Sequence, residues 1–274
     1  MAWEIFGDRV DTQRRVALGS LMFSGIFELL RKALRKPPRV LLGRLSRELR
    51  AEADRYFAPR RAEALNERVL LQNTHASTLP ELWDRLASRP YAVEILPHRV
   101  DREDILEKAG RAMSHRIELL GSGPKSLGKR IDWHTDFKTG HSWPSTYFRG
   151  IDYNNPERSS DVKVPWELSR MQWLIPVAQA FRLTQNERYA AFITETIDDW
   201  IANNPYASSV NWACTMEPAM RILTWTYLFH ACSSSIAWRD AAFQFRFLRA
   251  LYLHADFTER YLERSDVNLS LIHI

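Results

Sequence analysis

The sequence predicts a mostly α-helical protein built from helical hairpins, and three observations support this. From Pro165 onward, the apolar residues of the 274-residue chain recur at the three- and four-residue spacing of helices. The turns between these helices are short, as in TQNE, so neighbouring helices should run antiparallel. Successive hairpins also have similar helix lengths, which is typical of repeated α-hairpins in a solenoid or an (α/α) toroid.

The first 65 residues are predicted to form a basic helical region, followed by a second region over 66–268. A Pro-Pro pair breaks a first helix, and RVLLGRLSRELRAEADRYF then carries apolar residues at helical spacing. Between Glu28 and Arg61 there are eleven Lys and Arg against four Asp and Glu. Such a run is typical of a solvated helix face. Otherwise it marks an acidic partner such as nucleic acid, anionic lipid or a polyanionic sugar.

The sequence gives no signal for a membrane span, a metal or a cofactor. Residues 16–30 are mostly apolar, but they are too short to span a bilayer, lack a small-residue cleavage site and contain Glu28. We expect an amphipathic helix there and a cytoplasmic protein as written, or a periplasmic one if translation starts elsewhere. No CxxC, HExxH or glycine-rich phosphate loop occurs, so neither a metal nor a cofactor is expected. Cys214 and Cys232 lie in an apolar helical stretch and are predicted to be buried free thiols.

The middle of the chain has less helical character. AVEILPHRV, at 92–100, has the composition of a strand. Residues 101–121 indicate a helix capped by Asp101 that ends in a strand-like segment. Residues 126–165 carry few helical signals and are rich in Trp, His, Asp, Lys and Arg. A long loop of this kind inside a domain is uncommon and tends to be functional.

Four helices are predicted in the C-terminal part, at Pro165–Leu183, Glu187–Asn203, Trp212–His230 and Trp238–Glu263. Pro165 suits the first turn of its helix. Thr184 or Asn186 is expected to cap the second helix. Pro176 and Pro218 fall inside predicted helices and are expected to kink them, which can open a backbone carbonyl to a groove.

Polar and aromatic side chains gather in three clusters. The first is IDWHTDFKTGHSWP in the long loop. In the second, DVKVPWELSRMQW, the spacing of Trp166, Arg170 and Trp173 should place them on one helix face. In the third, VNWACTMEPAMR, Asn211 lies at a helix entrance ahead of a Glu–Arg pair. Together they supply these candidate substrate-binding residues: Trp133, His134, Asp136, Lys163, Trp166, Glu167, Arg170, Asn211, Trp212, Glu217 and Arg221.

A purely structural interpretation competes with the binding one. Glu167 and Arg170, like Glu217 and Arg221, have the spacing of intrahelical salt bridges worth about 0.2–0.5 kcal/mol each. The loop histidines can likewise be surface or structural hydrogen-bonding groups. The convergence of the clusters favours a binding site, because pockets that bind sugars combine aromatic faces with a few directed polar groups. In such sites Arg and Lys clamp carboxylates and sulfates.

These motifs resemble the N-terminal domain of the heparinase II/III family. The DWH…D loop, K-x-PWELSR, the NP…VNW turn and ME…AxR occur in that order, and the resemblance covers roughly residues 60–268. It implies an incomplete (α/α) toroid, and we expect the antiparallel β-sandwich that follows the toroid in the family to be absent from this chain. Pro218 departs from the family pattern, where an aliphatic residue more often follows the glutamate, and this puts the local geometry of Glu217 in question.

The resemblance also implies a reaction. Family members are polysaccharide lyases that act on uronic-acid polymers, including heparin, heparan sulfate and alginate-like chains. In β-elimination a base takes the C5 proton, an acid protonates the leaving O4, and the site neutralises the uronate carboxylate. The resemblance implies that an Asn from an NH motif neutralises the carboxylate, while later Tyr and His residues transfer the protons. The expected partner is therefore an acidic polysaccharide and not a nucleic acid.

The end of the chain bears on this expectation. In the family the NH motif follows shortly after a segment like SDVN, but here LSLIHI follows Asn268. These six residues are one translation of CTGTCTCTTATACACATC, which resembles a transposon end used to prepare sequencing libraries. We therefore expect residues 269–274 to be an adapter artefact and His273 to have no catalytic role. The catalytic Asn, Tyr and His would lie beyond the truncation, so the fragment itself is expected to be inactive.

Two alternative functions stay open. A uronate C5-epimerase of similar architecture starts with the same proton abstraction, and only a lyase forms an unsaturated, ultraviolet-absorbing product. A non-catalytic polyanion-binding module would use the basic N-terminal helices and would show salt-dependent binding without turnover.

Overall fold

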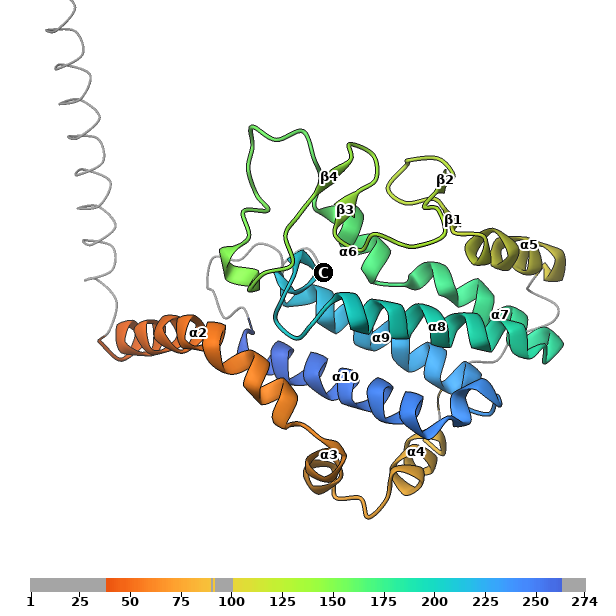
Figure 1. The fold of residues 1–274 in the computed structure, drawn as a ribbon, viewed down its shortest axis with the longest axis horizontal. Coiled ribbons are helices and arrows are strands. Elements are labelled where there is room, and N and C mark those ends of the chain that lie inside the picture. The colour runs from red at the N-terminus through yellow and green to blue at the C-terminus, as the bar shows by residue number, and fades with distance from the viewer. Residues whose placement is uncertain (1–37, 90, 92–100, 263–274) are drawn as a thin grey trace, which may run out of the picture. The chain divides into compact units, whose positions relative to one another are not determined.

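A computed structural model describes residues 38–89, 91 and 101–262, and these residues are mostly α-helical, as predicted (Figure 1). Some of the sequence predictions fall outside this part of the chain. They concern the amphipathic helix at 16–30, the strand at 92–100 and the adapter-derived residues 269–274.

The chain divides into two compact units, Met1–Asp54 and Arg55–Ile274. The described part of the first unit belongs to α2 (Pro38–Ala64), which continues into the second unit. Within the described ranges, no helix has the length and apolar content needed to cross a bilayer.

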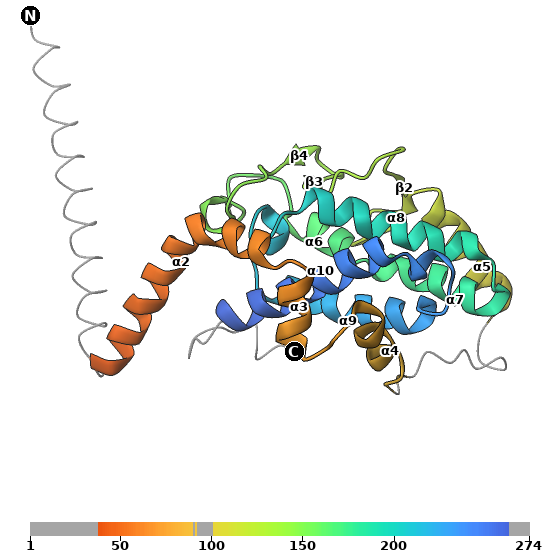
Figure 2. The ribbon, with the colours of Figure 1, turned by 60° about the horizontal axis from the view of Figure 1, so that its bottom comes forward.

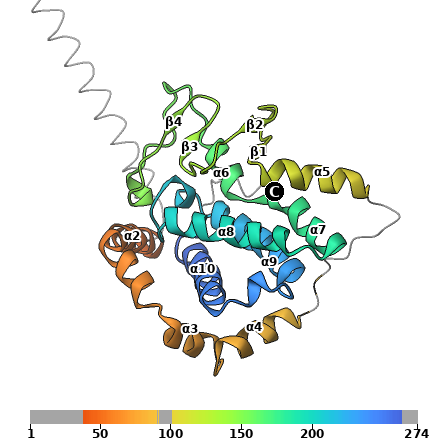
Figure 3. The ribbon, with the colours of Figure 1, turned by 45° about the vertical axis from the view of Figure 1, so that its right-hand side comes forward.

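The second unit is built from helices that pack side by side. α7 (Ile175–Thr184) and α8 (Glu187–Asn203) form one hairpin, and α9 (Met216–Cys232) and α10 (Ala241–Arg260) form the next (Figures 1 and 3). α5 (Arg102–Met113) packs on α7. α3 (Glu67–Thr74) and α4 (Leu79–Ala87) pack on α10 (Figure 2). The predicted order of helical hairpins is therefore present.

Several predicted helix starts are confirmed by their caps. The Asp101 carboxylate accepts hydrogen bonds from the backbone N–H groups of Glu103 (2.9 Å) and Asp104 (3.2 Å) at the start of α5. Asn186 caps α8 by accepting from the backbone N–H of Arg188 at 3.1 Å. These side chains satisfy N–H groups that have no partner within the helix, so each start is set locally.

The helix predicted over 165–183 is broken. α6 (Lys163–Ser169) ends before Arg170, Met171 adopts a left-handed conformation (φ 58°), and α7 begins at Ile175 after a short 3-10 turn. Pro176 explains the break, because its ring nitrogen has no N–H for a continuous helix and would clash with the preceding turn. Trp173 consequently leaves the face shared by Trp166 and Arg170, which corrects the predicted i, i+4, i+7 arrangement.

The predicted proline kinks are also wrong. Pro176 lies in the first turn of α7, and Pro218 is the third residue of α9. N–H groups in a first turn have no intrahelical acceptor, so proline interrupts no hydrogen bond at either position. α9 and α10 start later than predicted, because 3-10 turns over Val210–Trp212 and Ala237–Arg239 precede them.

The long loop contains little regular structure. β1 (Arg116–Ile117) pairs with β2 (Lys125–Ser126) in an antiparallel ladder, which confirms the strand-like end predicted after α5. β3 (Thr135–Asp136) pairs in the same way with β4 (His141–Ser142). A short 3-10 turn, Phe148–Gly150, follows them.

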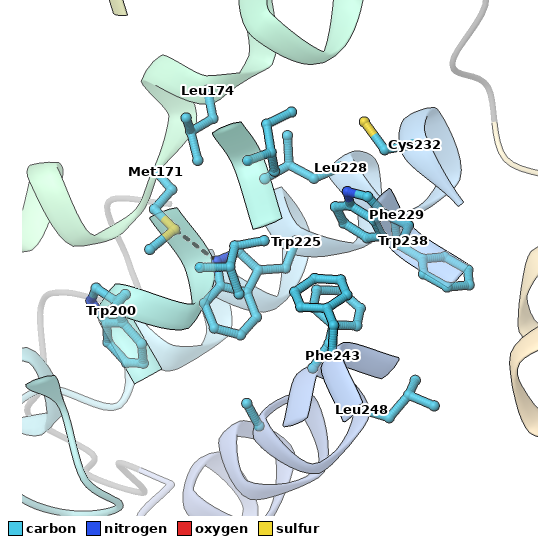
Figure 4. Packing of buried hydrophobic residues seen from close by; sticks show 14 of the residues in the cluster. Met171, Leu174, Trp200, Trp225, Leu228, Phe229, Cys232, Trp238, Phe243 and Leu248 are labelled. Carbon is cyan, nitrogen blue, oxygen red and sulfur yellow. Dashed lines mark hydrogen bonds between the residues drawn. The ribbon is translucent and has the colours of Figure 1, made fainter. Parts of the chain in front are cut away.

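Large aromatic residues fill the space between α7, α8, α9 and α10 (Figure 4). Trp225 is fully buried, donates its indole N–H to the Met171 sulfur at 3.1 Å and stacks on Phe247 at 5.7 Å. Truncating such an aromatic residue to alanine costs about 3–5 kcal/mol. This core fixes the helix ends at which the loops converge.

The cysteines are free, as predicted, but only Cys232 is fully buried. Burial raises the pKa of the Cys232 thiol to about 12. Cys214 is half-buried and precedes α9 instead of lying within it.

Candidate functional site

The three predicted clusters converge where the loop 131–162, α6 and the segment 204–217 meet. Figure 1 shows β3, β4 and α6 gathered at this place. Six of the candidate residues are buried: Trp133, Asp136, Asn211, Trp212, Glu217 and Arg221. The half-buried ones are His134, Trp166, Glu167 and Arg170, whereas Lys163 is exposed.

Asp136 organises the loop. Its carboxylate accepts hydrogen bonds from the backbone N–H of Lys138 (2.8 Å), the Thr139 hydroxyl (2.8 Å) and the backbone N–H of Asp161 (2.9 Å). Burial by itself would raise the pKa of Asp136, but these donors together lower it below its ordinary value. The carboxylate thus ties the β3–β4 turn to Asp161, two residues before α6, and its oxygens are occupied inside the protein.

Asn204 and Asn211 form a buried polar hub beneath the loop. The Asn211 side-chain N–H₂ donates to the backbone carbonyl of Trp133 (2.8 Å) and to Asn204 Oδ1 (2.9 Å). The Ser209 hydroxyl donates to the same Asn204 oxygen at 2.8 Å. His134 Nε2 lies 3.1 Å from that oxygen and, because an amide oxygen only accepts, must be the donor. This hub joins the loop to the turn between α8 and α9.

The indole N–H groups of the candidate tryptophans are also used internally. Trp133 Nε1 donates to Asp199 Oδ2 at 2.7 Å. Trp166 Nε1 donates to the Val210 carbonyl at 2.9 Å and thereby fixes α6 on the turn before α9. Only Trp166 retains a partly exposed ring, so it is the candidate aromatic face that a ligand can reach.

Arg221 is a buried cation held between two indole rings. Its guanidinium carbon lies 4.5 Å from the ring centre of Trp200 and 5.4 Å from that of Trp212. Its Nη2 donates to the Asn211 carbonyl at 2.7 Å, and its Nε donates to His254 Nε2 at 2.9 Å. Burial lowers the pKa of Arg221 to about 9; the Glu217 carboxylate opposes this shift, and Arg170 adds to it.

His254 must be neutral to accept this hydrogen bond. Its Nδ1 donates to the Ala250 carbonyl at 2.7 Å, which leaves Nε2 as the acceptor for Arg221. Burial, followed by the charge of Arg221, lowers the pKa of His254 well below its ordinary value. A protonated imidazole would place two cations in contact inside the core.

Arg170 joins α6 to α9 through a bidentate ion pair. Its Nε and Nη2 donate to the two Glu217 oxygens at 2.9 and 2.7 Å, and its Nη1 donates to Glu167. The hydrogen bonds to Glu217 raise the pKa of Arg170. With Arg221 nearby, two carboxylates and two guanidinium groups balance in charge, which reduces the cost of burying them.

This arrangement corrects the predicted Glu217–Arg221 salt bridge. The carboxylate binds Arg170 of another element, while Arg221 turns to His254 and Asn211. The predicted Glu167–Arg170 pair does form. Both arginines are therefore occupied internally, so they position the loops and are not free to clamp an anion.

Several partners of the candidate residues have no local signal in the sequence. Asn204 lies in the turn after α8, and His254 lies 33 residues from Arg221 on α10, so no local spacing connects them. Asp161 and Asp199 likewise contact candidate residues that are distant in the sequence.

One short exposed segment near the site has only cations as its charged residues. Lys125, Lys129 and Arg130 are exposed, and no acidic residue lies between Leu119 and Ile131. Lys138 Nζ donates to the Leu120 carbonyl at 2.7 Å, which holds this segment against the β3–β4 loop. We call Lys125, Lys129 and Arg130 the basic loop. Within the described ranges, no group of three His, Cys, Asp or Glu residues is placed to hold a metal ion.

Comparisons with known proteins identify the family of the chain. A family model described as "Heparinase II/III N-terminus" matches residues 109–273, more than half of the chain. A heparin-sulfate lyase of Bacteroides stercoris is 30% identical over 88 residues, which cover 31% of this chain and 13% of that enzyme. The matched part is thus about an eighth of the relative's length.

Two solved structures are similar, both of the heparan sulfate lyase HepC from Pedobacter heparinus, one of them a mutant. The first is 22% identical, and the match covers 69% of this chain and 28% of that chain. The mutant is 24% identical, and the match covers 65% of this chain and 26% of that chain. Both have a TM-score of 0.49. The family match alone spans the loop, α6, the polar hub and the buried ion cluster. The chain therefore belongs to the heparinase II/III family, within whose N-terminal part the candidate site lies.

Proposed function

We propose that this chain is the N-terminal, substrate-binding part of a polysaccharide lyase that cleaves uronic-acid-containing polymers by β-elimination. The family match supports the reaction class, and the name of the Bacteroides stercoris relative supports a heparin-like polymer as substrate. We further propose that the chain by itself binds such a polymer without cleaving it.

The observation that carries the proposal is the basic loop. Lys125, Lys129 and Arg130 are exposed and lie on a segment that contains no acidic residue. Exposed cations on one short segment attract a polyanion and raise its rate of association. Lys163 is also exposed, at the start of α6, and the half-buried Trp166 follows three residues later.

The internal network supports binding more than proton transfer. His134 is engaged with Asn204, and Glu167 is engaged with Arg170. These contacts hold both side chains against neighbouring elements, which suits residues that position the loop and α6. In this proposal the network fixes the loop, while the base and the acid of the reaction come from elsewhere in the enzyme.

The test is heparin binding by a triple variant, Lys125→Ser, Lys129→Ser and Arg130→Ser. If each exposed ionic contact contributes about 0.5–1 kcal/mol, the three together predict roughly 10- to 100-fold weaker binding at low salt. The difference should shrink as salt screens the charges. A matched control removes three exposed cations from other elements: Arg102, Arg182 and Arg239.

Isothermal titration at two salt concentrations distinguishes the outcomes. Equal weakening in the control and the basic-loop variant would show that only net charge matters, and the proposed site would be wrong. Ultraviolet absorbance of an unsaturated product in the same samples tests the second part. Product formed by the chain alone would contradict the binding-only role.

A further inference from the structure

The His134 side chain hydrogen-bonds to the rest of the described protein through only one of its two ring nitrogens. Its Nε2 donates to Asn204 Oδ1 at 3.1 Å, as described above. Within the described ranges, Nδ1 makes no hydrogen bond. The imidazole is half-buried, but the buried polar atoms that lack a partner in this part of the chain do not include Nδ1. This nitrogen is therefore accessible from solvent.

The polar hub decides which nitrogen carries the proton. Asn204 Nδ2 donates to the Trp200 carbonyl at 3.0 Å, and this fixes the orientation of the amide so that Oδ1 faces His134. Because Oδ1 can only accept, the neutral imidazole carries its proton on Nε2 and keeps a lone pair on Nδ1. Ser209 and Asn211 donate to the same oxygen, so the acceptor itself is held in place.

The backbone of His134 is fixed as well. Its N–H donates to Asp132 Oδ1 at 3.1 Å, and its carbonyl accepts from the backbone N–H of Trp143 at 3.0 Å. The neighbouring Trp133 is buried, and its carbonyl is tied to Asn211. The Nδ1 lone pair is therefore oriented before a ligand binds, which lowers the entropic cost of binding.

The chemistry of Nδ1 selects the group that it can bind. Sulfates and ionised carboxylates offer only acceptor atoms, so neither can hydrogen-bond to a nitrogen lone pair. The exposed Asp132 carboxylate, hydrogen-bonded to the His134 backbone, adds negative charge to the same turn. A hydroxyl group can donate to Nδ1 and carries no charge. The sugar units of a uronic-acid polymer carry such groups wherever they are not sulfated.

We propose that His134 determines specificity in this binding site by accepting, at Nδ1, a hydrogen bond from an unsubstituted sugar hydroxyl of the bound polymer. The inference rests on the proposed function and deepens it. The basic loop attracts the anionic groups of the polymer through charge alone, whereas His134 distinguishes a hydroxyl from a sulfate at one position. A polymer with a sulfate at that position loses the hydrogen bond and places an acceptor against the lone pair.

Nitrogen-15 NMR of the full chain, labelled at histidine, tests this contact. The probe is a chemically O-desulfated heparin oligosaccharide, and the spectra are recorded at pH 8, where an ordinary imidazole is neutral. We expect the free protein to show His134 protonated at Nε2 and unprotonated at Nδ1. Addition of the oligosaccharide should shift the Nδ1 resonance as a hydrogen bond forms, while Nε2 stays protonated. The spectrum of His134→Gln assigns the signal.

Binding measurements on variants separate recognition from structure. His134→Leu should bind the oligosaccharide roughly 2- to 10-fold more weakly, as expected for the loss of one neutral hydrogen bond. His134→Gln supplies an amide N–H for Asn204 and an amide oxygen for the ligand, so it should recover most of the affinity. The matched control is His230→Leu, which removes another half-buried imidazole on α9, outside the loop, and should bind like the wild type. Circular dichroism checks that all three variants fold.

Several results would overturn the inference. They are a proton on Nδ1 in the free protein, protonation of both nitrogens on binding, and an equal loss of affinity in His230→Leu. Polymer binding with an unchanged Nδ1 resonance would contradict this inference and leave the proposed function intact. No binding of heparin or of the oligosaccharide by the wild type would contradict both, so the two failures are distinguishable.

Discussion

Replacing Glu217 by alanine tests whether the buried ion cluster holds α6 on α9. The Glu217 side chain is fully buried and accepts both strong hydrogen bonds of Arg170. Its removal leaves Arg170 with Glu167 alone and takes away the carboxylate that opposes the lowered pKa of Arg221. The half-buried Arg170 and the buried Arg221 would then lack their common counter-charge.

The expected cost follows from this burial. Removing one partner of a buried ion pair destabilises a protein by about 3–5 kcal/mol. For a unit of this size, each kcal/mol lowers Tm by about 2–4 °C, so Glu217→Ala should lower Tm by roughly 6–20 °C. The Arg246–Asp198 pair provides a matched control, because it has the same bidentate geometry but an exposed Arg246 side chain. Asp198→Ala should cost only about 0–1 kcal/mol.

The assay is urea unfolding followed by circular dichroism for Glu217→Ala, Arg170→Ala, the double variant and Asp198→Ala. The double variant should cost less than the sum of the single variants by about 1–3 kcal/mol, because the second removal relieves an unpaired charge. A cost below about 1 kcal/mol for Glu217→Ala, or strict additivity, would refute a buried, coupled ion pair.

Other residues give further predictions. Asp136 has a lowered pKa, so its stabilisation is present above the ordinary value of 3.8 and is lost as pH falls through the lower folded value. The urea midpoints of Asp136→Asn and wild type should therefore converge as pH falls below 3.8, and a constant gap would contradict this. His254→Leu leaves Arg221 Nε without an acceptor and should lower the free energy of unfolding by about 1.5–3 kcal/mol. His254→Gln can retain the acceptor and should lower it less. Equal losses of unfolding free energy in chemical denaturation would argue against that hydrogen bond. In a thiol-labelling assay at pH 8, Cys232 should be protected in the native protein and react in urea, since burial raises its pKa to about 12; native labelling of Cys232 faster than of Cys214 would contradict its burial.

Much of the helical framework was predictable because its signals are local. The Asp101 and Asn186 caps act within three residues, and α8 has the predicted bounds Glu187–Asn203. The break before Pro176 was missed, although the rule behind it is equally local. Apolar spacing continues across Arg170 and Met171, and this hides the point where the backbone leaves the helix.

The candidate site was predictable as a set of residues but not as a set of contacts. Trp166, Glu167 and Arg170 do lie together, yet Arg170 also binds Glu217, 47 residues away. Spacing alone predicts that Glu217 pairs with Arg221, since residues four apart on a helix are neighbours. That rule holds for exposed pairs, whereas a buried charge takes the partner that best satisfies all its hydrogen bonds.

The sequence by itself determined the helical class, the order of the hairpins and the family motifs, because caps, turns and apolar periodicity act over a few residues. Only the tertiary structure decided which polar groups are hydrogen-bonded within the protein and which are exposed to a ligand. Arg170, Arg221 and Asp136 are occupied by partners from distant segments, while the basic loop stays exposed. Desolvation explains this division, because a buried charge must find partners wherever the fold supplies them, and a solvated one need not.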